Sequence, residues 1–356
     1  MKFNKELLLK FPPLLMYWNQ HQNTRKMPWK GEKDPYKIWL SEIILQQTRV
    51  EQGLKYYEKF TVNFPDISSL ATAKDQKIYK LWEGLGYYSR CKNLIETARF
   101  ISKKLNGKFP DQFEAILALK GIGHYTASAI ASFAYDLPYA VVDGNVFRVL
   151  SRIFGIKKPI DSAEGKRLFS HLAFELLDKK QPGLYNQALM DFGAVICKPY
   201  PLCNICLFKD HCFAFKNDLV NELPVKEKKL KIKTRWFNYL VIEYNNKIYI
   251  HKRVQSDIWK NLYEFILIES NSDISLNKIF SKAEKEKILN KNSYKIISIS
   301  PVYSQQLSHQ KIMGRFIRIA LKKETIIPGF KTVSLKQLSR YAFPRFITAY
   351  FEKANS

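Results

Sequence analysis

The sequence predicts a protein of two domains, an all-helical one followed by one that mixes strands and helices. The chain has 356 residues, which is more than a single hydrophobic core usually serves. From about residue 4 to residue 224, apolar residues recur three and four positions apart, which is the period of an α-helix. Beyond residue 236 apolar and polar residues alternate, which is the period of a strand. We therefore expect an all-α domain over 1–224 and an α+β domain over 236–356.

The composition predicts a folded protein that binds a polyanion. Lys and Arg number 58 against 32 Asp and Glu, a formal net charge of +26, and 46% of the residues are hydrophobic. Such a chain can bury large cores, unlike a disordered basic tail. Its positive charge attracts polyanions through counterion release, so nucleic acid is the leading partner. Acidic membranes and ribosomal RNA would attract the same charge.

The sequence gives no sign of a membrane partner or of export. Lys5, Glu6, Lys10 and the pair Pro12-Pro13 break the apolar N-terminal run far short of a signal peptide. No apolar stretch reaches the length that a bilayer demands. We expect a cytoplasmic, nucleoid-associated monomer in a bacterium-like cell, whose five cysteines are ligands or free thiols rather than disulfides.

Two carboxyl groups of the helical half have surroundings that favour opposite protonation states. Asp34-Pro35 predicts the start of a helix whose apolar residues surround Glu42, and a carboxyl group in apolar surroundings tends to keep its proton. Asp143, in VVDGNVFRVLSR, precedes another helix, whose N-terminal partial charge favours the anion. Such a pair suits acid-assisted departure with stabilisation of an oxocarbenium-like centre. A helix-surface glutamate and an ordinary N-cap are the alternatives, and the sequence does not show that the two groups meet.

A two-glycine turn in LKGIGHYTASAIASFAY predicts a backbone-binding hairpin. Gly121 and Gly123 permit unusual φ values and close backbone approach, and the N–H groups at the start of the following helix can bind a phosphate oxygen. In a basic chain this pattern is typical of a helix-hairpin-helix that grips DNA whatever its sequence. Two glycines alone do not establish it.

Four cysteines lie in one loop-rich stretch, CKPYPLCNICLFKDHC, and predict a metal site. They are Cys197, Cys203, Cys206 and Cys212. Four thiolates so close together suffice for a closed tetrahedral metal site or a cluster. The spacing leaves both zinc and a [4Fe–4S] cluster open. Cys91 lies outside this stretch and is expected to be a packed small residue.

The basic run KEKKLKIKTR, residues 226–235, separates the two periodic patterns and is predicted to be a linker over 225–235. After it, FNYLVIEY and KIYIHKR flank Asn245-Asn246, which predicts a β-hairpin. YEFILIE, YKIISIS and GRFIRIAL predict further strands, and PRFITAYFEKA predicts a final helix.

Together these segments resemble the adenine DNA glycosylase (MutY) family of the helix-hairpin-helix, endonuclease III-like superfamily. The resemblance rests on PWKGEKDPYKIWLSEIILQQTRV, LWEGLGYYSRCKNL, LKGIGHYTASAIASFAY, VVDGNVFRVLSRIFG, NQALMDFGAVIC and the cysteine loop. It implies a helix-hairpin-helix glycosylase domain with an iron–sulfur loop at 197–212, followed by a Nudix-like lesion-recognition domain. It also implies a monofunctional base-excision-repair enzyme that flips out and hydrolyses adenine paired with 8-oxoguanine or guanine in double-stranded DNA.

The resemblance assigns roles to individual residues. Glu42 resembles the general acid that protonates adenine at N7 and later helps to activate water, and Asp143 the carboxylate that stabilises the positive sugar. Tyr125 and Asn145 occupy supporting catalytic positions. Trp29 and Gln187 match residues that line the adenine pocket. The remaining DNA-binding and lesion-binding positions are Gln47, Thr48, Leu85, Tyr87, Lys120, Gly121, Gly123, Ser308 and His309.

The cysteine loop resembles the family's [4Fe–4S] loop, so the resemblance favours a structural cluster over zinc. The first cysteine spacing is five residues rather than the usual six. Lys30 replaces a usual arginine, Lys120 a usual proline and Leu307 a usual phenylalanine. The second domain lacks the acidic helix of nucleotide-hydrolysing Nudix enzymes, so it is expected to bind rather than hydrolyse.

Two other functions are considered. An endonuclease III-like lyase would attack the sugar with a lysine amine at the hairpin position that Tyr125 occupies, and a phenol cannot form that Schiff base. A non-catalytic iron–sulfur protein that binds lesions would not need both Glu42 and Asp143.

Overall fold

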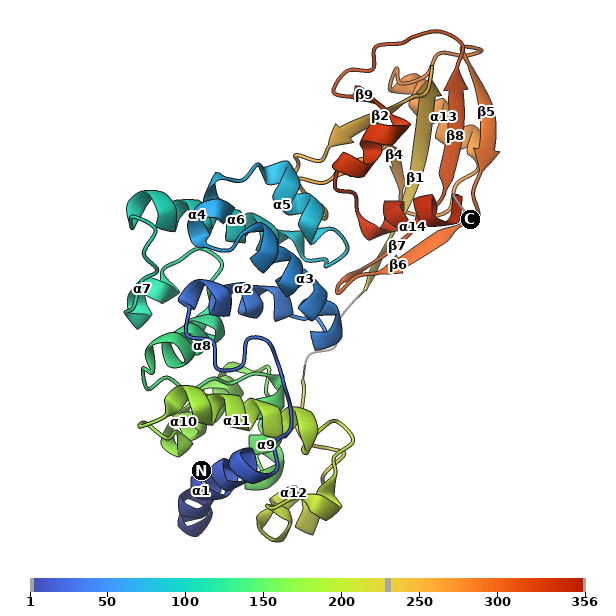
Figure 1. Cartoon of the computed structure of the whole chain (residues 1–356). Helices are drawn as coiled ribbons and strands as arrows, with labels where there is room; N and C mark the ends of the chain where they lie inside the picture. The colour runs from blue at the N-terminus through green and yellow to red at the C-terminus, as the bar shows by residue number, and fades with distance from the viewer. Residues whose placement is uncertain (1–2, 228–231, 355–356) are drawn as a thin grey trace. The chain divides into compact units, whose positions relative to one another are not determined.

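The computed structural model of the chain describes residues 3–227 and 232–354 (Figure 1). These residues form two compact units, in which residues 73–92 group with the strand-rich C-terminal half and the rest of the helical half forms the other unit. The predicted linker lies partly outside the described residues, at 228–231, and strand β1 begins within it at Lys233. Among the described residues, no helix is both long and apolar enough to cross a membrane.

The first unit is built from helices, as the sequence predicts. They are α1 (Lys5–His21), α2 (Pro35–Leu45), α3 (Val50–Asn63), α4 (Ile67–Thr72), α7 (Phe113–Leu117), α8 (His124–Tyr135), α9 (Gly144–Phe154), α10 (Ala163–Leu176), α11 (Pro182–Val195) and α12 (Phe213–Lys216). Helix α6 (Tyr88–Lys104) crosses the boundary between the units in the sequence.

Helices α1, α9, α10 and α11 share one hydrophobic core with the cysteine loop. Phe11 of α1 stacks on Phe208 of the loop with ring centroids 4.7 Å apart, and Trp18 meets Phe192 of α11 edge-on at 5.1 Å. Helix α2 packs against α3 and α8. These contacts hold α2, α8, α9 and α11 in fixed positions, and the candidate site lies among them.

The second unit contains a nine-stranded sheet and three α-helices among its described residues. The strands are β1 (Lys233–Tyr244), β2 (Lys247–Lys252), β3 (Tyr263–Glu264), β4 (Ile266–Ser270), β5 (Tyr294–Ile299), β6 (Tyr303–Gln306), β7 (Gln310–Gly314), β8 (Phe316–Leu321) and β9 (Lys331–Ser334). The helices are α5 (Asp75–Trp82), α13 (Leu276–Lys285) and α14 (Arg345–Ala354).

Strand β1 organises this sheet. It pairs antiparallel with β2 and β4 and parallel with β7 and β8. Alternate side chains of β1 face opposite sides of the sheet. Leu240 and Ile242 pack into a hydrophobic core with α13 on one side. On the other side Tyr239 contacts Phe316 and also Phe346, a residue of α14. The sheet is therefore covered by a helix on each face.

The predicted hairpin at Asn245-Asn246 is confirmed. Both residues have positive φ, 46° and 59°, and they join β1 to β2 with Tyr244 opposite Lys247. The other predicted strands correspond to β3 with β4, to β5 and to β8, and the predicted final helix is α14. Helix α13 and strands β6, β7 and β9 are not predicted from the sequence.

Candidate active site

Helix α2 carries Glu42 into the interior of the first unit. The Asp34 carboxylate accepts the N–H of Tyr36 at 2.9 Å and Pro35 occupies the first turn, so local chemistry determines where the helix begins. Glu42 is only 7% exposed. Burial raises its pKa from the ordinary 4.5 to about 7, a hydrogen bond from Tyr125 opposes the rise, and nearby Asp143 adds to it. At neutral pH this carboxyl group therefore keeps its proton part of the time.

Asp143 is the N-cap of α9. One of its oxygens accepts the N–H of Val146 at 2.8 Å, and the other accepts the side-chain amide of Asn145 at 2.7 Å. Burial raises the pKa of Asp143, and these hydrogen bonds lower it without fully offsetting the rise. The sequence predicts only the lowering effect of the helix start, because it does not reveal how deeply the carboxylate is buried.

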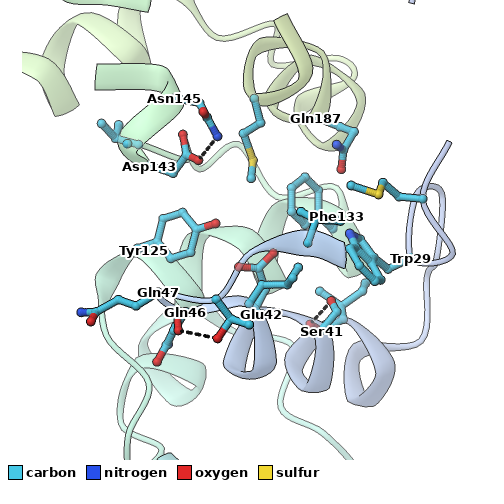
Figure 2. A pocket seen from close by; sticks show the side chains of 18 of the residues that line it. Trp29, Ser41, Glu42, Gln46, Gln47, Tyr125, Phe133, Asp143, Asn145 and Gln187 are labelled. Atoms are coloured by element: carbon cyan, nitrogen blue, oxygen red, sulfur yellow. Dashed lines mark hydrogen bonds between the residues drawn. The ribbon is translucent and has the colours of Figure 1, made fainter. Parts of the chain in front are cut away.

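The two carboxyl groups line one cavity of about 410 Å³. Figure 2 shows Glu42 on α2 and Asp143 at the start of α9, with Tyr125 of α8 beside them. Burial and the neighbouring carboxylates raise the pKa of Tyr125 well above its usual value, so its phenol stays protonated. The cavity therefore places a partly protonated acid, a second carboxylate and a neutral hydroxyl around one space.

Eight of the predicted site residues line this cavity. They are Trp29, Glu42, Gln47, Thr48, Tyr125, Asp143, Asn145 and Gln187. The lining also contains residues that the sequence does not predict, among them Arg25, Met27, Ser41, Gln46, Phe133 and Met190. Ser41, Gln46, Phe133 and Met190 lie within motifs of the resemblance, but the sequence assigns them no role, because only the packing of the helices brings them to the cavity.

A buried carboxylate lies behind the lining residues. Asp191 has no exposed side-chain surface and accepts hydrogen bonds from Asn23, Arg25, Lys30 and Gln187. Lys30, which replaces a usual arginine, forms an ion pair with Asp191 at 2.9 Å. The sequence does not predict Asp191 as a functional residue.

Of the two hairpin glycines, Gly121 has the unusual φ and close packing that the sequence predicts, whereas Gly123 has an ordinary extended backbone, with φ −98°. Gly121 has φ +81°, and a Cβ added there would lie 2.6 Å from the Cβ of Asn93. Gly123 is the N-cap of α8 and has open space around it. Lys120 forms an ion pair with Glu96 at 2.5 Å. The hairpin residues do not line the cavity.

In the second unit, two predicted lesion-binding residues meet. The hydroxyl groups of Tyr87 and Ser308 are hydrogen-bonded at 2.5 Å, although 221 positions separate them in the sequence. Tyr87 is 42% exposed and has positive φ, 49°, and the Arg90 guanidinium lies 5.1 Å from its ring centre. Leu85 is only 5% exposed, whereas His309 is exposed.

The four clustered cysteines line a second, smaller cavity. Burial raises the pKa of Cys206 to about 12 and also raises those of Cys197 and Cys212. An Arg152 N–H lies 3.6 Å from the Cys197 sulfur. Such buried thiols become anions when a metal centre stabilises the negative charge. Cys91 is buried elsewhere, as predicted.

Helix α9 connects the two cavities. Arg148 donates to the carbonyl of Cys197 at 2.7 Å and to the side-chain oxygen of Asn145 at 2.9 Å. Asn145 in turn donates to Asp143. A continuous chain of hydrogen bonds therefore runs from the backbone of the cysteine loop to a carboxylate of the larger cavity.

Two family models match the chain. Residues 40–172 match the model described as HhH-GPD superfamily base excision DNA repair protein, and residues 238–353 match a NUDIX domain. The chain is 36% identical over 304 residues to adenine DNA glycosylase from Buchnera aphidicola subsp. Baizongia pistaciae, covering 83% of this chain and 86% of that one. It is 38% identical over 211 residues to adenine DNA glycosylase from Homo sapiens, covering 56% and 38%.

Solved structures show the same fold for the helical part. A thermostable thymine-DNA glycosylase superposes with a TM-score of 0.55 at 30% identity, covering 60% of this chain and 98% of that one. Endonuclease III in a non-covalent DNA complex superposes with a TM-score of 0.53 at 16% identity, covering 61% and 99%. The second likeness concerns the fold alone.

Proposed function

The chain belongs to the adenine DNA glycosylase family and is a DNA glycosylase of base excision repair, and we propose that it hydrolyses adenine paired with 8-oxoguanine or guanine in double-stranded DNA. One observation carries the chemistry: Glu42, with a pKa of about 7, and Asp143 line the same cavity. A cavity of about 410 Å³ is large enough for a single flipped base.

In this proposal Glu42 delivers a proton to N7 of the flipped adenine, which makes the base a better leaving group. Asp143 stabilises the positive charge that develops on the sugar as the glycosidic bond breaks. The Tyr125 phenol and the Asn145 amide hydrogen-bond the two carboxyl groups and hold them in place. Water then completes the hydrolysis, with Glu42 accepting a proton from it.

The cavity favours hydrolysis over lyase chemistry. Schiff-base formation needs an amine at the sugar, and no lysine lies among the described residues that line the cavity. Lys120, the nearest lysine to the hairpin in the sequence, is paired with Glu96. A monofunctional enzyme is therefore proposed.

We further propose that Cys197, Cys203, Cys206 and Cys212 hold a [4Fe–4S] cluster. The donor set fits, since all four side chains line one cavity. Four cysteines would also suit zinc, and the resemblance of this loop to the family's iron–sulfur loop favours the cluster. A bound cluster would supply a structural cross-link for a loop that carries Lys198 and Lys209.

For the opposite strand, Tyr87 and Ser308 are proposed to contact 8-oxoguanine. Their hydroxyl groups lie together, and both can donate or accept hydrogen bonds. Leu85 is buried, so Tyr87 is the more accessible of these two predicted lesion-binding residues.

A glycosylase assay tests the proposal directly. Duplexes with A:8-oxoguanine, A:G and A:T pairs are incubated with the protein, and strand breaks are measured with and without alkali. Breaks opposite 8-oxoguanine and guanine that appear only after alkali are expected. Breaks without alkali would indicate a lyase, and the absence of breaks in every duplex would refute the function.

A further inference from the structure

The side chain of Gln187 lines the pocket, and its amide is hydrogen-bonded to a buried carboxylate that does not line the pocket. Its Nε2 donates to Oδ1 of Asp191 at 3.0 Å, one helical turn further along α11. Asp191 is completely buried and does not line the cavity. It therefore acts on a bound molecule only through the side chains that it holds.

Both oxygens of Asp191 accept hydrogen bonds. Oδ1 accepts from Arg25 at 2.7 Å as well as from Gln187, and Oδ2 accepts from Lys30 and Asn23, both at 2.9 Å. Two cations beside one buried carboxylate compensate its charge. Each oxygen accepts two hydrogen bonds from N–H donors, and a carboxylate has no hydrogen to donate. Gln187 therefore faces a group that accepts only.

This polarity decides which way the Gln187 amide is turned. The amide has a donor end, Nε2, and an acceptor end, Oε1. With the amide reversed, Oε1 would face an Asp191 oxygen at hydrogen-bonding distance, and two acceptors repel each other. Oε1 is consequently left for the cavity, where Figure 2 shows the Gln187 side chain opposite the Glu42 side of the pocket.

We propose that Asp191 is a positioning residue that sets the base preference of the pocket by locking Gln187 with its acceptor toward the flipped base. This inference rests on the proposed function. An acceptor at that position suits the exocyclic amino group of adenine, which donates hydrogen bonds. It repels the 6-carbonyl oxygen that hypoxanthine carries at the same position. The selectivity for an amino purine thus originates in a residue that never touches the base.

The test compares single-turnover release of adenine and of hypoxanthine from otherwise identical duplexes. Asp191→Asn keeps the size of the side chain but offers a donor as well as an acceptor, so the Gln187 amide can reverse. The ratio of adenine to hypoxanthine release is expected to fall about tenfold. Asp191→Glu is larger but still accepts only, and it is expected to keep the wild-type ratio.

These two variants separate positioning from packing. If Asp191 served only to fill space, the larger Glu would disturb the fully buried site more than Asn, and the ratio would not depend on donor character. Asn23→Ala removes another partner of Asp191 without touching Gln187 and should leave the ratio unchanged. In a Gln187→Ala protein, adding Asp191→Asn should change the ratio no further.

An unchanged ratio in folded Asp191→Asn protein overturns the inference. Absence of adenine release from the wild-type protein would instead overturn the proposed function, so the two failures are distinct. If neither Asp191 variant folds, the inference is tested instead by measuring hydrogen exchange of the Gln187 side-chain amide in wild-type protein. An anchored amide should exchange at least about tenfold more slowly than exposed glutamine side chains, and equal rates would overturn the inference.

Discussion

Replacing Glu42 by Gln is expected to stabilise the first unit at alkaline pH while removing adenine release. Burial raises the pKa of Glu42 from 4.5 to about 7 in the folded protein, so the folded state binds this proton more tightly than the unfolded chain. The stability that the proton supplies is complete below pH 4.5 and is lost as the pH rises through 7. The difference between the two pKa values is worth about 3 kcal/mol by pH 8.

Glutamine cannot ionise, so the variant does not suffer this loss. Relative to the wild type, its free energy of unfolding should increase by up to about 3 kcal/mol between pH 5 and pH 8, which corresponds to a rise in melting temperature of about 6 °C. Thermal melts of both proteins at the two pH values, followed by circular dichroism of the helices, measure this change. The difference in melting temperature at pH 5 serves as the control, because it measures the effect of the glutamine amide on hydrogen bonding apart from ionisation.

The activity should change in the opposite direction. Gln cannot deliver a proton, so single-turnover release of adenine should fall by on the order of 100-fold or more. The wild-type rate should decline about tenfold per pH unit above 7, because only the protonated acid acts. If the difference in melting temperature between the two proteins is the same at pH 5 and pH 8, Glu42 does not have a raised pKa. Release at the wild-type rate in the variant would falsify its role as the acid.

Five further substitutions test three other parts of the molecule. Gly121→Ala should cost about 1–3 kcal/mol in urea unfolding because of its positive φ, whereas Gly123→Ala, which has open space around it and loses only the N-cap preference of glycine over alanine, should cost at most about 1 kcal/mol. Ser308→Ala should lower the preference for A:8-oxoguanine over A:G about fivefold, and Tyr87→Phe should add no further loss if the pair acts as a unit. Cys203→Ser should remove the visible absorption of purified protein and lower its melting temperature, and retention of both would contradict the cluster assignment.

The elements that the sequence predicts well are governed by residues close together in the chain. Asp34-Pro35 sets the start of α2, and Asn245-Asn246 sets the turn between β1 and β2, because capping and turn geometry depend on a few neighbouring side chains. Helix α13 is missed although its buried residues, Ile279, Phe280 and Ala283, have helical spacing. Strand β6 is missed because Gln305 and Gln306 do not follow an apolar alternation.

The candidate site is predictable only in part, since its members meet through packing. The family resemblance supplies Glu42 and Asp143, and the structure places them on one cavity. Arg25 and Asp191 form an ion pair although 166 positions separate them in the sequence, and no local sequence pattern predicts this pair. The pKa of Asp143 depends on burial, a property of the assembled helices that its helix-start position does not reveal.

The central strand of the second unit is also its earliest strand along the chain. During synthesis β1 emerges before every strand with which it pairs, and its parallel partner β8 begins only at Phe316. One edge of β1 can pair with β2 and β4 soon after they are made, but the edge that pairs with β8 must remain unpaired on the ribosome while about 70 more residues are made. Lys233 and Arg235 at the start of β1 place charge beside the apolar stretch of this strand, and flanking charges of this kind discourage association with other nascent chains.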